Sequence, residues 1–352
     1  MKKKGLNLNF KSFYLSYCDM AIDLGTSNIL VLIKEKGIVL DEPSVVAIDK
    51  KRKEVIARGE EAREMLGRTP QRIKAVKPLK DGVIADFKAT QALLKNIIGK
   101  LCKKYNIKKL RVVVGVPSGI TEVERRAVEE TIVQTGAKEV YLIEEPIAAA
   151  IGANMEISEP SGNIVVDIGG GTTEVAVISL GGIVVSNSIR IAGDELDEDI
   201  LNYVKKEFNL LIGTTTAENI KIRIGCAKPP VTNETIEIRG LDLNTGLPRV
   251  QEISSYQVLE AISDSINEIV ECVKITLEKT PPELSADVMR KGIILTGGGA
   301  LIKDIDKLLS EKIEIPVYIA EAPLSCVVNG AGKTLQDIKK LRESIRNRKR
   351  IW

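Results

Sequence analysis

Two segments of the chain repeat one pattern of hydrophobic and polar positions. An apolar run over residues 20–33 is interrupted after Asp23, and a second apolar run over 164–178 is interrupted after Asp167. Glycine and hydroxyl residues fill both interruptions. Each segment therefore predicts a buried strand that ends in an aspartate, a tight turn and a second strand. Because this design occurs twice, we predict a chain built from two related α/β halves.

Both halves continue with further strands and helices. Residues 111–116 predict a buried strand and 121–135 its helix, while 291–296 predict a strand that leads through a glycine turn to a helix from Leu301. Two segments rich in charged or turn-forming residues predict small inserted subdomains, so we expect two lobes with a cleft between them. The predicted divisions are a basic and aromatic N-terminal extension over 1–18, a first lobe over 19–160 with an insert at about 46–88, a second lobe over 161–334 with an insert at about 196–255, and a basic amphipathic C-terminal helix or tail over 335–352.

The composition narrows the classes of function. With 352 residues, 44% of them hydrophobic and 28% charged, the chain is typical of a soluble protein of two or three domains. It contains no histidine, which excludes Ser-His-Asp and Cys-His catalysis and histidine metal sites. The five scattered cysteines argue against a zinc site or a disulfide framework and predict buried, reduced thiols. No apolar run approaches the roughly 20 residues of a membrane span, and the first residues lack a signal-peptide pattern, so we predict a cytoplasmic protein.

The net charge of +3 is distributed unevenly. Residues 1–20 carry four lysines against one aspartate, and residues 339–352 carry seven lysines or arginines against one glutamate, which leaves the body between them acidic. An acidic body with basic ends argues against a nucleic-acid groove and favours contact of both termini with an anionic membrane surface. At the C-terminus, apolar residues at helical spacing predict a basic amphipathic helix. An ordinary subdomain helix followed by a solvated tail is the alternative.

The glycine turns are candidates for phosphate binding. Backbone amides in such a turn can converge on phosphate oxygens, and the aspartate before it can hold a divalent ion through water. One such turn is more often a simple hairpin, but a third glycine run at 296–300 favours a nucleotide site. Two better-known motifs are absent. Segment 330–334 lacks the first glycine of a P-loop because position 327 is Val327, and neither 169–174 nor 297–302 carries the third glycine of the dinucleotide fingerprint.

Six segments together resemble MreB, the bacterial actin family. They are IDLGT at 22–26, AVKPLKDGVIAD at 75–86, IEEPIAAAIG at 143–152, DIGGGTTE at 167–174, AENIK at 217–221 and LTGGGA at 295–300. Several of them are shared by all actin-like ATPases, whereas DGVIAD and the Glu-Glu-Pro segment resemble MreB in particular. The resemblance extends from about residue 19 to 334.

The resemblance implies an α/β, actin-like two-lobed ATPase fold, with duplicated RNase H-like domains and two small inserted subdomains. It also implies that ATP and Mg²⁺ bind between the lobes, with phosphates on the two turns, a hydrated ion near the aspartates, and the nucleoside near a helix and the third glycine run. The implied ATP-binding residues are Thr26, Ser27, Asn28, Gly169, Gly170, Gly171, Glu218, Asn219, Ile220, Lys221, Gly297, Gly298, Gly299 and Ala300, and the implied metal residues are Asp23 and Asp167. Without the resemblance, Glu218 and Lys221 are as well explained by a solvated ion pair within one helix.

The implied reaction is attack of water on the γ-phosphate. This chemistry depends on positioning and charge neutralisation more than on a strong base, which agrees with a chain that has no histidine. We expect Glu145 to orient the water with help from the Thr172 hydroxyl, and Glu144 is the alternative. A carboxylate near the γ-phosphate predicts slow hydrolysis, which suits a timer for filament disassembly.

The predicted function is that of an ATP-hydrolysing cytoskeletal protein. It polymerises with itself, by the resemblance as antiparallel double protofilaments, attaches to the inner face of the cell membrane through its basic termini, and helps to determine cell shape. The alternative is a sugar-type kinase of the same superfamily, which needs an aspartate base beside a sugar pocket. A chaperone of the Hsp70 type needs a separate peptide-binding domain after the ATPase.

Overall fold

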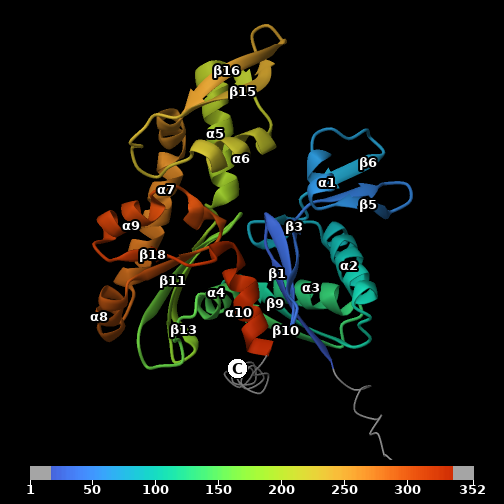
Figure 1. Cartoon of the computed structure of the whole chain (residues 1–352), viewed down its shortest axis with the longest axis vertical. Coiled ribbons are helices and arrows are strands. Elements are labelled where there is room, and N and C mark those ends of the chain that lie inside the picture. The colour runs from blue at the N-terminus through green and yellow to red at the C-terminus, as the bar shows by residue number, and fades with distance from the viewer. Residues whose placement is uncertain (1–16, 336–352) are drawn as a thin grey trace, which may run out of the picture.

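Two five-stranded sheets of identical topology form the centre of the molecule. The structure, a computed structural model, describes residues 17–335 (Figure 1). The first sheet has the order β10-β9-β1-β2-β3 and the second the order β13-β12-β11-β17-β18. If the five strands of each half are numbered 1 to 5 in chain order, both sheets have the spatial order 5-4-1-2-3. Strands 1, 2 and 3 pair antiparallel, and strands 4 and 5 run parallel to strand 1. The predicted duplication is therefore confirmed by topology. The strands are β1 Cys18–Leu24, β2 Asn28–Ile33, β3 Gly37–Pro43, β9 Leu110–Val116, β10 Glu139–Glu144, β11 Asn163–Ile168, β12 Thr173–Ser179, β13 Gly182–Ile189, β17 Ile293–Thr296 and β18 Val317–Ile319.

Helices cover both faces of each sheet, which is why the central strands are apolar at almost every position. In β1, Met20 and Ile22 face a core shared with α2, while Ala21 between them faces a core shared with α4 and α10. In β11, Ile164 and Val166 pack in a core with α5 and α7. The helices of these layers are α2 Phe87–Lys104, α3 Glu122–Val133, α4 Glu145–Gly152, α5 Gly193–Phe208, α7 Ser255–Glu278, α8 Pro282–Lys291, α9 Ile305–Ile313 and α10 Cys326–Thr334.

The helices α4 and α10 lie between the two sheets (Figure 1). Their core contains strand residues of both halves, including Val113 of β9 and Val165 of β11. The two helices approach closely because each carries a glycine at the contact: a Cβ on Gly152 would collide with the backbone of Cys326, and one on Gly330 with the backbone of Ala148. The lobes are thus joined by a third, shared core.

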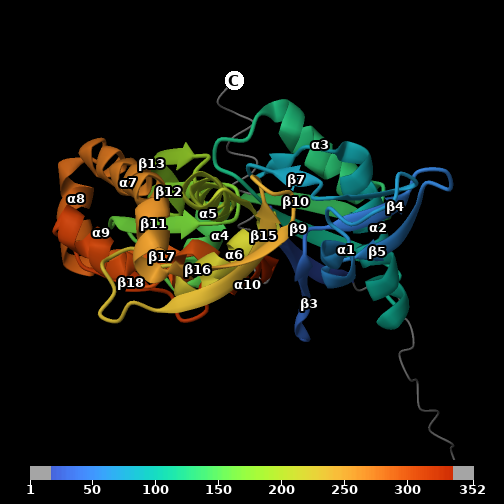
Figure 2. The ribbon, with the colours of Figure 1, turned by 90° about the horizontal axis from the view of Figure 1, so that it is seen from above.

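A small subdomain extends from each lobe at the same end of the molecule (Figures 1 and 2). The first contains the sheet β5-β4-β6 with α1, and the second contains the sheet β14-β15-β16 with α6. Their elements are β4 Val46–Asp49, β5 Glu54–Arg58, α1 Glu60–Glu64, β6 Ile73–Val76, β14 Leu210–Leu211, α6 Thr214–Ile224, β15 Thr235–Asp242 and β16 Pro248–Ser254. The short strands β7 Leu79–Lys80 and β8 Val83–Ile84 form a hairpin that leads from the first subdomain to α2.

Several local predictions can be compared with the elements observed. The helix predicted over 121–135 is α3, with Thr121 and Glu124 forming a capping box at its start. The helix predicted from Leu301 is wrong at its start, because a 3₁₀ turn, η1 Gly298–Leu301, comes first and α9 begins at Ile305. Asp304, directly before α9, has the left-handed φ of 62°, which interrupts the helix.

The helix α10 belongs by sequence to the second half but packs on α4 and on the first-lobe strands β1, β2 and β9. A second 3₁₀ turn, η2 Pro323–Ser325, leads into it. The predicted N-terminal extension and C-terminal amphipathic helix lie almost wholly outside the described residues. All five cysteines are unpaired, three buried and two half-buried. None of the helices between residues 17 and 335 combines the length and the apolar character that crossing a membrane requires.

Candidate functional site

The turns of the two duplicated hairpins meet across the lobes. A Cβ on Gly170 would collide with the side chain of Ser27, and a Cβ on Gly171 would lie 2.8 Å from Thr26 Oγ1 and 2.8 Å from the amide nitrogen of Asp81. Glycine is therefore required at both positions by close approach. Thr26 is buried and its Oγ1 accepts a hydrogen bond from the amide of Gly82 at 3.1 Å.

The segment that contains Asp81 and Gly82 also touches the second lobe. Both residues have positive φ, 51° and 74°, in the β7–β8 turn. A Cβ on Gly82 would lie 3.3 Å from Thr172 Cγ2, so the Thr172 side chain faces this turn. The Asp-Gly turn therefore brings the DGVIAD segment of the first lobe against the predicted catalytic threonine of the second.

Four acidic side chains gather from both halves beside these turns. Asp23 is the second-last residue of β1 and Asp167 the second-last residue of β11, close to the strand ends expected from the hairpin pattern. Glu145 is the first residue of α4, and Glu174 lies in β12 directly opposite Asp167. Burial raises the pKa of Asp23 to about 7, with further contributions from Asp167 and Asp41. Burial likewise raises the pKa of Asp167, although a 2.8 Å hydrogen bond from the Thr296 hydroxyl partly opposes it.

The pKa values of the two glutamates of this group are raised as well. The pKa of Glu145 is raised well above its usual range by burial and by the neighbouring charges of Glu174, Asp23 and Asp167. Burial raises the pKa of Glu174 to about 7, although both of its oxygens accept a hydrogen bond from the amide of Ser118 at 3.2 Å. Because neighbouring carboxylates repel one another, a cation bound beside this group would stabilise the ionised forms of the four carboxyls.

The third glycine run lies against the end of β11. Thr296 of β17 is paired with Asp167, and Gly297 follows with a φ of 80°. A Cβ on Gly297 would collide with the carbonyl of Ile168, and a Cβ on Gly299 would collide with the Ile168 side chain. The predicted residues Gly298 and Ala300 continue this run in η1, where Ala300 is fully buried.

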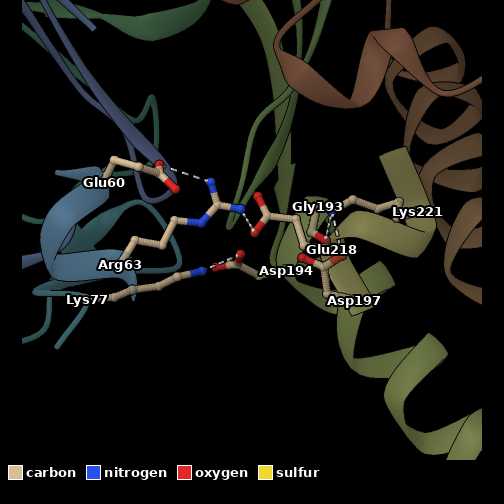
Figure 3. Close-up of polar contacts among 8 residues, drawn as sticks. All are labelled: Glu60, Arg63, Lys77, Gly193, Asp194, Asp197, Glu218 and Lys221. Carbon is tan, nitrogen blue, oxygen red and sulfur yellow. Dashed lines mark hydrogen bonds and ion pairs between the residues drawn. The ribbon is translucent and has the colours of Figure 1, made fainter. Parts of the chain in front are cut away.

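The predicted nucleoside-binding residues lie on α6, where their side chains have different partners. Lys221 Nζ lies 2.8 Å from Asp197 Oδ1 and donates to the carbonyl of Gly193 at 2.6 Å, whereas Glu218 accepts from Arg63 at 2.7 Å (Figure 3). The alternative of an ion pair between Glu218 and Lys221 is therefore wrong. Asn219 of the same segment is exposed, and Ile220 is buried in the second-lobe core.

The start of α5 links α6 to the second glycine turn. The amides of Gly193 and Asp194 donate to the carbonyls of Gly169 and Gly170 at 3.1 and 2.7 Å. Burial raises the pKa of the Asp197 carboxyl to about 6, although Lys221 opposes it. The predicted residues of α6 and of the Gly169–Gly171 turn are thus neighbours in space.

Sequence reasoning did not identify four polar residues of this region: Arg63, Lys77, Asp197 and Glu174. Only Glu174 leaves a clear signal, because it is a charged residue inside an otherwise apolar strand, and the equivalent position in the first hairpin is Leu30. The other three are charged residues of segments read as subdomain surface, and their partners are distant in sequence.

Comparison with known proteins places the chain in a family. A family model described as MreB/Mbl protein matches residues 17–343. The chain belongs to the MreB/Mbl family. Among relatives, it is 54% identical over 323 residues to the cell shape-determining protein Mbl of Bacillus subtilis (strain 168), covering 92% of this chain and 97% of Mbl. It is 51% identical over 325 residues to the cell shape-determining protein MreB of Escherichia coli (strain K12), covering 91% and 94%. The resemblance noted in the sequence is confirmed.

Solved structures confirm the predicted actin-like fold. MreB5 of Spiroplasma citri bound to ADP superposes with a TM-score of 0.88 at 41% identity, covering 93% of this chain and 99% of MreB5, and its AMPPNP-bound form superposes with a TM-score of 0.87 at 39% identity, covering 94% and 99%. A MamK double helical filament shares the fold at 22% identity and a TM-score of 0.78, covering 91% and 99%.

The residues present fit a nucleotide with a divalent cation. Burial raises the pKa values of Asp23, Glu145 and Asp167, with neighbouring carboxylates adding to the effect on Asp23 and Glu145, so a bound cation would stabilise their ionised forms. The glycines that a phosphate turn requires lie beside these carboxyls, where the two hairpins approach each other. Among residues 17–335, no three acidic or cysteine side chains lie close enough to hold a metal ion directly. Such a donor set suits an ion that keeps much of its water shell, as Mg²⁺ does.

Proposed function

We propose that this protein binds and hydrolyses ATP and polymerises into membrane-associated filaments that take part in determining cell shape. One observation carries the proposal: two duplicated aspartate-glycine hairpins and the carboxyls around them converge from both lobes, in a chain of the MreB/Mbl family. The names of its Mbl and MreB relatives, and the ADP and AMPPNP held by MreB5, support both parts of the proposal.

In this proposal, the backbone amides of Thr26–Asn28 and Gly169–Gly171 bind the phosphates. Asp23 and Asp167 orient the water shell of Mg²⁺, which supplies positive charge to the phosphates when bound. Segment 218–221 contacts the nucleoside, and residues 297–300 lie beneath the base. Glu218 accepts from Arg63 through Oε2, and in this proposal its other carboxylate oxygen contacts the nucleoside while that pair is kept.

Glu145 is the residue proposed to hold the attacking water. It stands at the start of α4, and all three other carboxyls of the group act on its pKa. A raised pKa makes the ionised Glu145 carboxylate a better proton acceptor than an ordinary glutamate. Glu144, the alternative, is the last residue of β10 and acts electrostatically on Glu174. Thr172, facing the β7–β8 turn, is proposed to help position the water.

Filament formation and membrane attachment are the less direct parts of the proposal. We propose that the filaments are antiparallel double protofilaments, and that they attach to anionic lipid through the basic segments 1–18 and 335–352. The lobes proposed are 19–160 and 161–334, with α10 returning to the first. Hydrolysis is proposed to be slow and to act as a timer for disassembly.

Sedimentation and phosphate release test the proposal together. With ATP and Mg²⁺, we expect the purified protein to pellet and to release phosphate slowly, and electron microscopy on anionic lipid to show filaments. Transfer of phosphate to sugars without pelleting would support the sugar-kinase alternative instead. None of the relatives or structures named above is a sugar kinase.

A further inference from the structure

Two ion pairs connect the small subdomain of the first lobe to helices of the second lobe. Arg63 Nη2 lies 2.7 Å from Glu218 Oε2, and Lys77 Nζ lies 3.0 Å from Asp194 Oδ1 (Figure 3). Arg63 is in α1 and Lys77 directly follows β6, whereas Glu218 is in α6 and Asp194 in the first turn of α5. Each pair therefore joins segments more than 100 residues apart in the sequence.

Both pairs border the proposed nucleotide site. Glu218 belongs to the segment proposed to contact the nucleoside, and the amide of Asp194 donates to the carbonyl of Gly170 in the second phosphate turn. One pair thus lies at the nucleoside end and the other beside the phosphate turn. Because each pair joins the first subdomain to α5 or α6, movement of that subdomain away from these helices breaks both pairs. In the proposed function, this movement is the one that opens a path for a ligand held between the lobes.

We propose that the Arg63–Glu218 and Lys77–Asp194 pairs form a latch that retains the bound nucleotide and sets its rate of release. This inference rests on the proposed function, since it assumes that the nucleotide binds between the lobes. Arg63 also has a second acidic neighbour on its own helix, Glu60, at 3.5 Å. When the latch opens, Glu60 remains as a partner for the guanidinium of Arg63.

The expected size of the effect follows from the exposure of the side chains. The four latch side chains are between 24% and 38% exposed, so each pair is worth only a fraction of what a buried pair would be. Partly exposed pairs of this kind slow an opening step by about two- to fivefold each. Both together predict a change of roughly four- to 25-fold if the pairs act independently. Because the charges are accessible to ions, the effect should decrease as salt rises.

The test measures dissociation of a fluorescent ATP analogue, chased by excess ATP, from the full-length protein with Mg²⁺. Arg63→Gln and Lys77→Gln are each expected to accelerate release two- to fivefold, and the double variant more than either. The matched control is Lys74→Gln, because Lys74 pairs with Asp86 at 2.8 Å inside the first lobe, and this change should leave the rate as in the wild type.

A charge exchange separates the latch from a general loss of folding. Lys77→Asp and Asp194→Lys alone should each accelerate release, and the two together should restore a rate slower than either alone. Asp194 lies in the first turn of α5, where the helix dipole disfavours a lysine. The release rate of the double exchange is therefore compared with the rates of the two single variants. Raising the salt concentration should accelerate release from the wild type more than from the Arg63→Gln/Lys77→Gln variant.

The measured rates distinguish a failure of the latch from a failure of the proposed function. If the wild type fails to bind the analogue, the proposed function is overturned and the latch with it. If the wild type binds but the double glutamine variant releases at the wild-type rate, the latch alone is overturned. A double exchange no slower than its single variants would refute the pairing of Lys77 with Asp194.

Discussion

The buried glutamate of β12 offers a direct test of the electrostatics of the site. Glu174 is 1% exposed, lies opposite Asp167 in the strand pair, and is close enough to Glu145 to raise its pKa. Its own pKa is about 7, against an ordinary value of 4.5, with burial as the main cause. In the folded protein, the neutral form of Glu174 is therefore favoured below about pH 7. The replacement Glu174→Gln keeps the size of the side chain and one acceptor for the Ser118 amide, and removes the charge.

The sign of the effect follows from proton binding. Below pH 4.5, Glu174 is protonated in both the folded and the unfolded chain and contributes nothing to the pH dependence. Between 4.5 and about 7 the folded chain holds the proton more strongly, so the free energy of unfolding falls as pH rises. A displacement of the pKa from 4.5 to about 7 corresponds to roughly 3 kcal/mol once both states are ionised. We expect the Glu174→Gln variant to avoid this loss and also to relieve Glu145.

Urea unfolding without nucleotide or Mg²⁺ measures the difference. We expect the stability of Glu174→Gln relative to the wild type to be greater at pH 8 than at pH 5 by about 2–3 kcal/mol. Glu237→Gln, at an exposed strand position in β15, serves as the control and should show no such change. A difference between Glu174→Gln and the wild type that is the same at both pH values would refute the reasoning. So would a variant less stable than the wild type at pH 8.

Three further predictions test catalysis, packing and membrane attachment. Glu145→Ala should abolish most phosphate release while leaving ATP binding intact, and unchanged release in a phosphate assay would move the role elsewhere. Gly330→Ala places a Cβ against the carbonyl of Ala148 and should lower stability in thermal unfolding by about 1–3 kcal/mol. In Gly99→Ala of α2, the added Cβ meets nothing within 4 Å, so this variant should raise the free energy of unfolding by about 0.5–1 kcal/mol. Deleting residues 339–352 should reduce pelleting with anionic liposomes, and full retention would assign attachment to the N-terminus.

The hairpins could be predicted from sequence because their signals are local. In each, a run of apolar residues, an aspartate and a glycine turn lie within 15 neighbouring positions, and the same order occurs in both halves. The boundary of α9 is less local. A helix beginning at Leu301 satisfies the hydrophobic pattern, but the close approach of Gly299 to Ile168 and the left-handed Asp304 end the first turn as a 3₁₀ helix.

The partners of the charged residues could not be predicted, since they depend on how the lobes pack. Glu218 has a lysine one turn away on its own helix, which makes an internal pair the simplest prediction. In the structure, each residue pairs with a residue of another helix: Lys221 with Asp197 of α5, and Glu218 with Arg63 of α1. Nothing near Arg63 in the sequence indicates that it reaches a residue 155 positions away.

The glycines of segment 330–334 show how packing can imitate a binding motif. Gly330 and Gly332 resemble part of a P-loop in sequence, yet both lie inside α10. Gly330 is required because the backbone of α4 passes directly over it, and a Cβ on Gly332 would lie 2.9 Å from Leu32 of β2. The pattern reflects the close packing of α10 against its neighbours, which a search for phosphate-binding motifs does not detect.

This packing bears on catalysis because α4 carries Glu145 at one end and Gly152 at the other. Its last turn is fixed against α10, and its alanines pack in the core shared by both sheets, so α4 belongs to the junction between the lobes. Asp23 and Asp167, in contrast, belong to the two sheets on either side of that junction. A rotation of one lobe relative to the other therefore changes the position of Glu145 relative to at least one aspartate. Small changes in the closure of the lobes then alter the alignment of the proposed water, and alignment is what this reaction depends on.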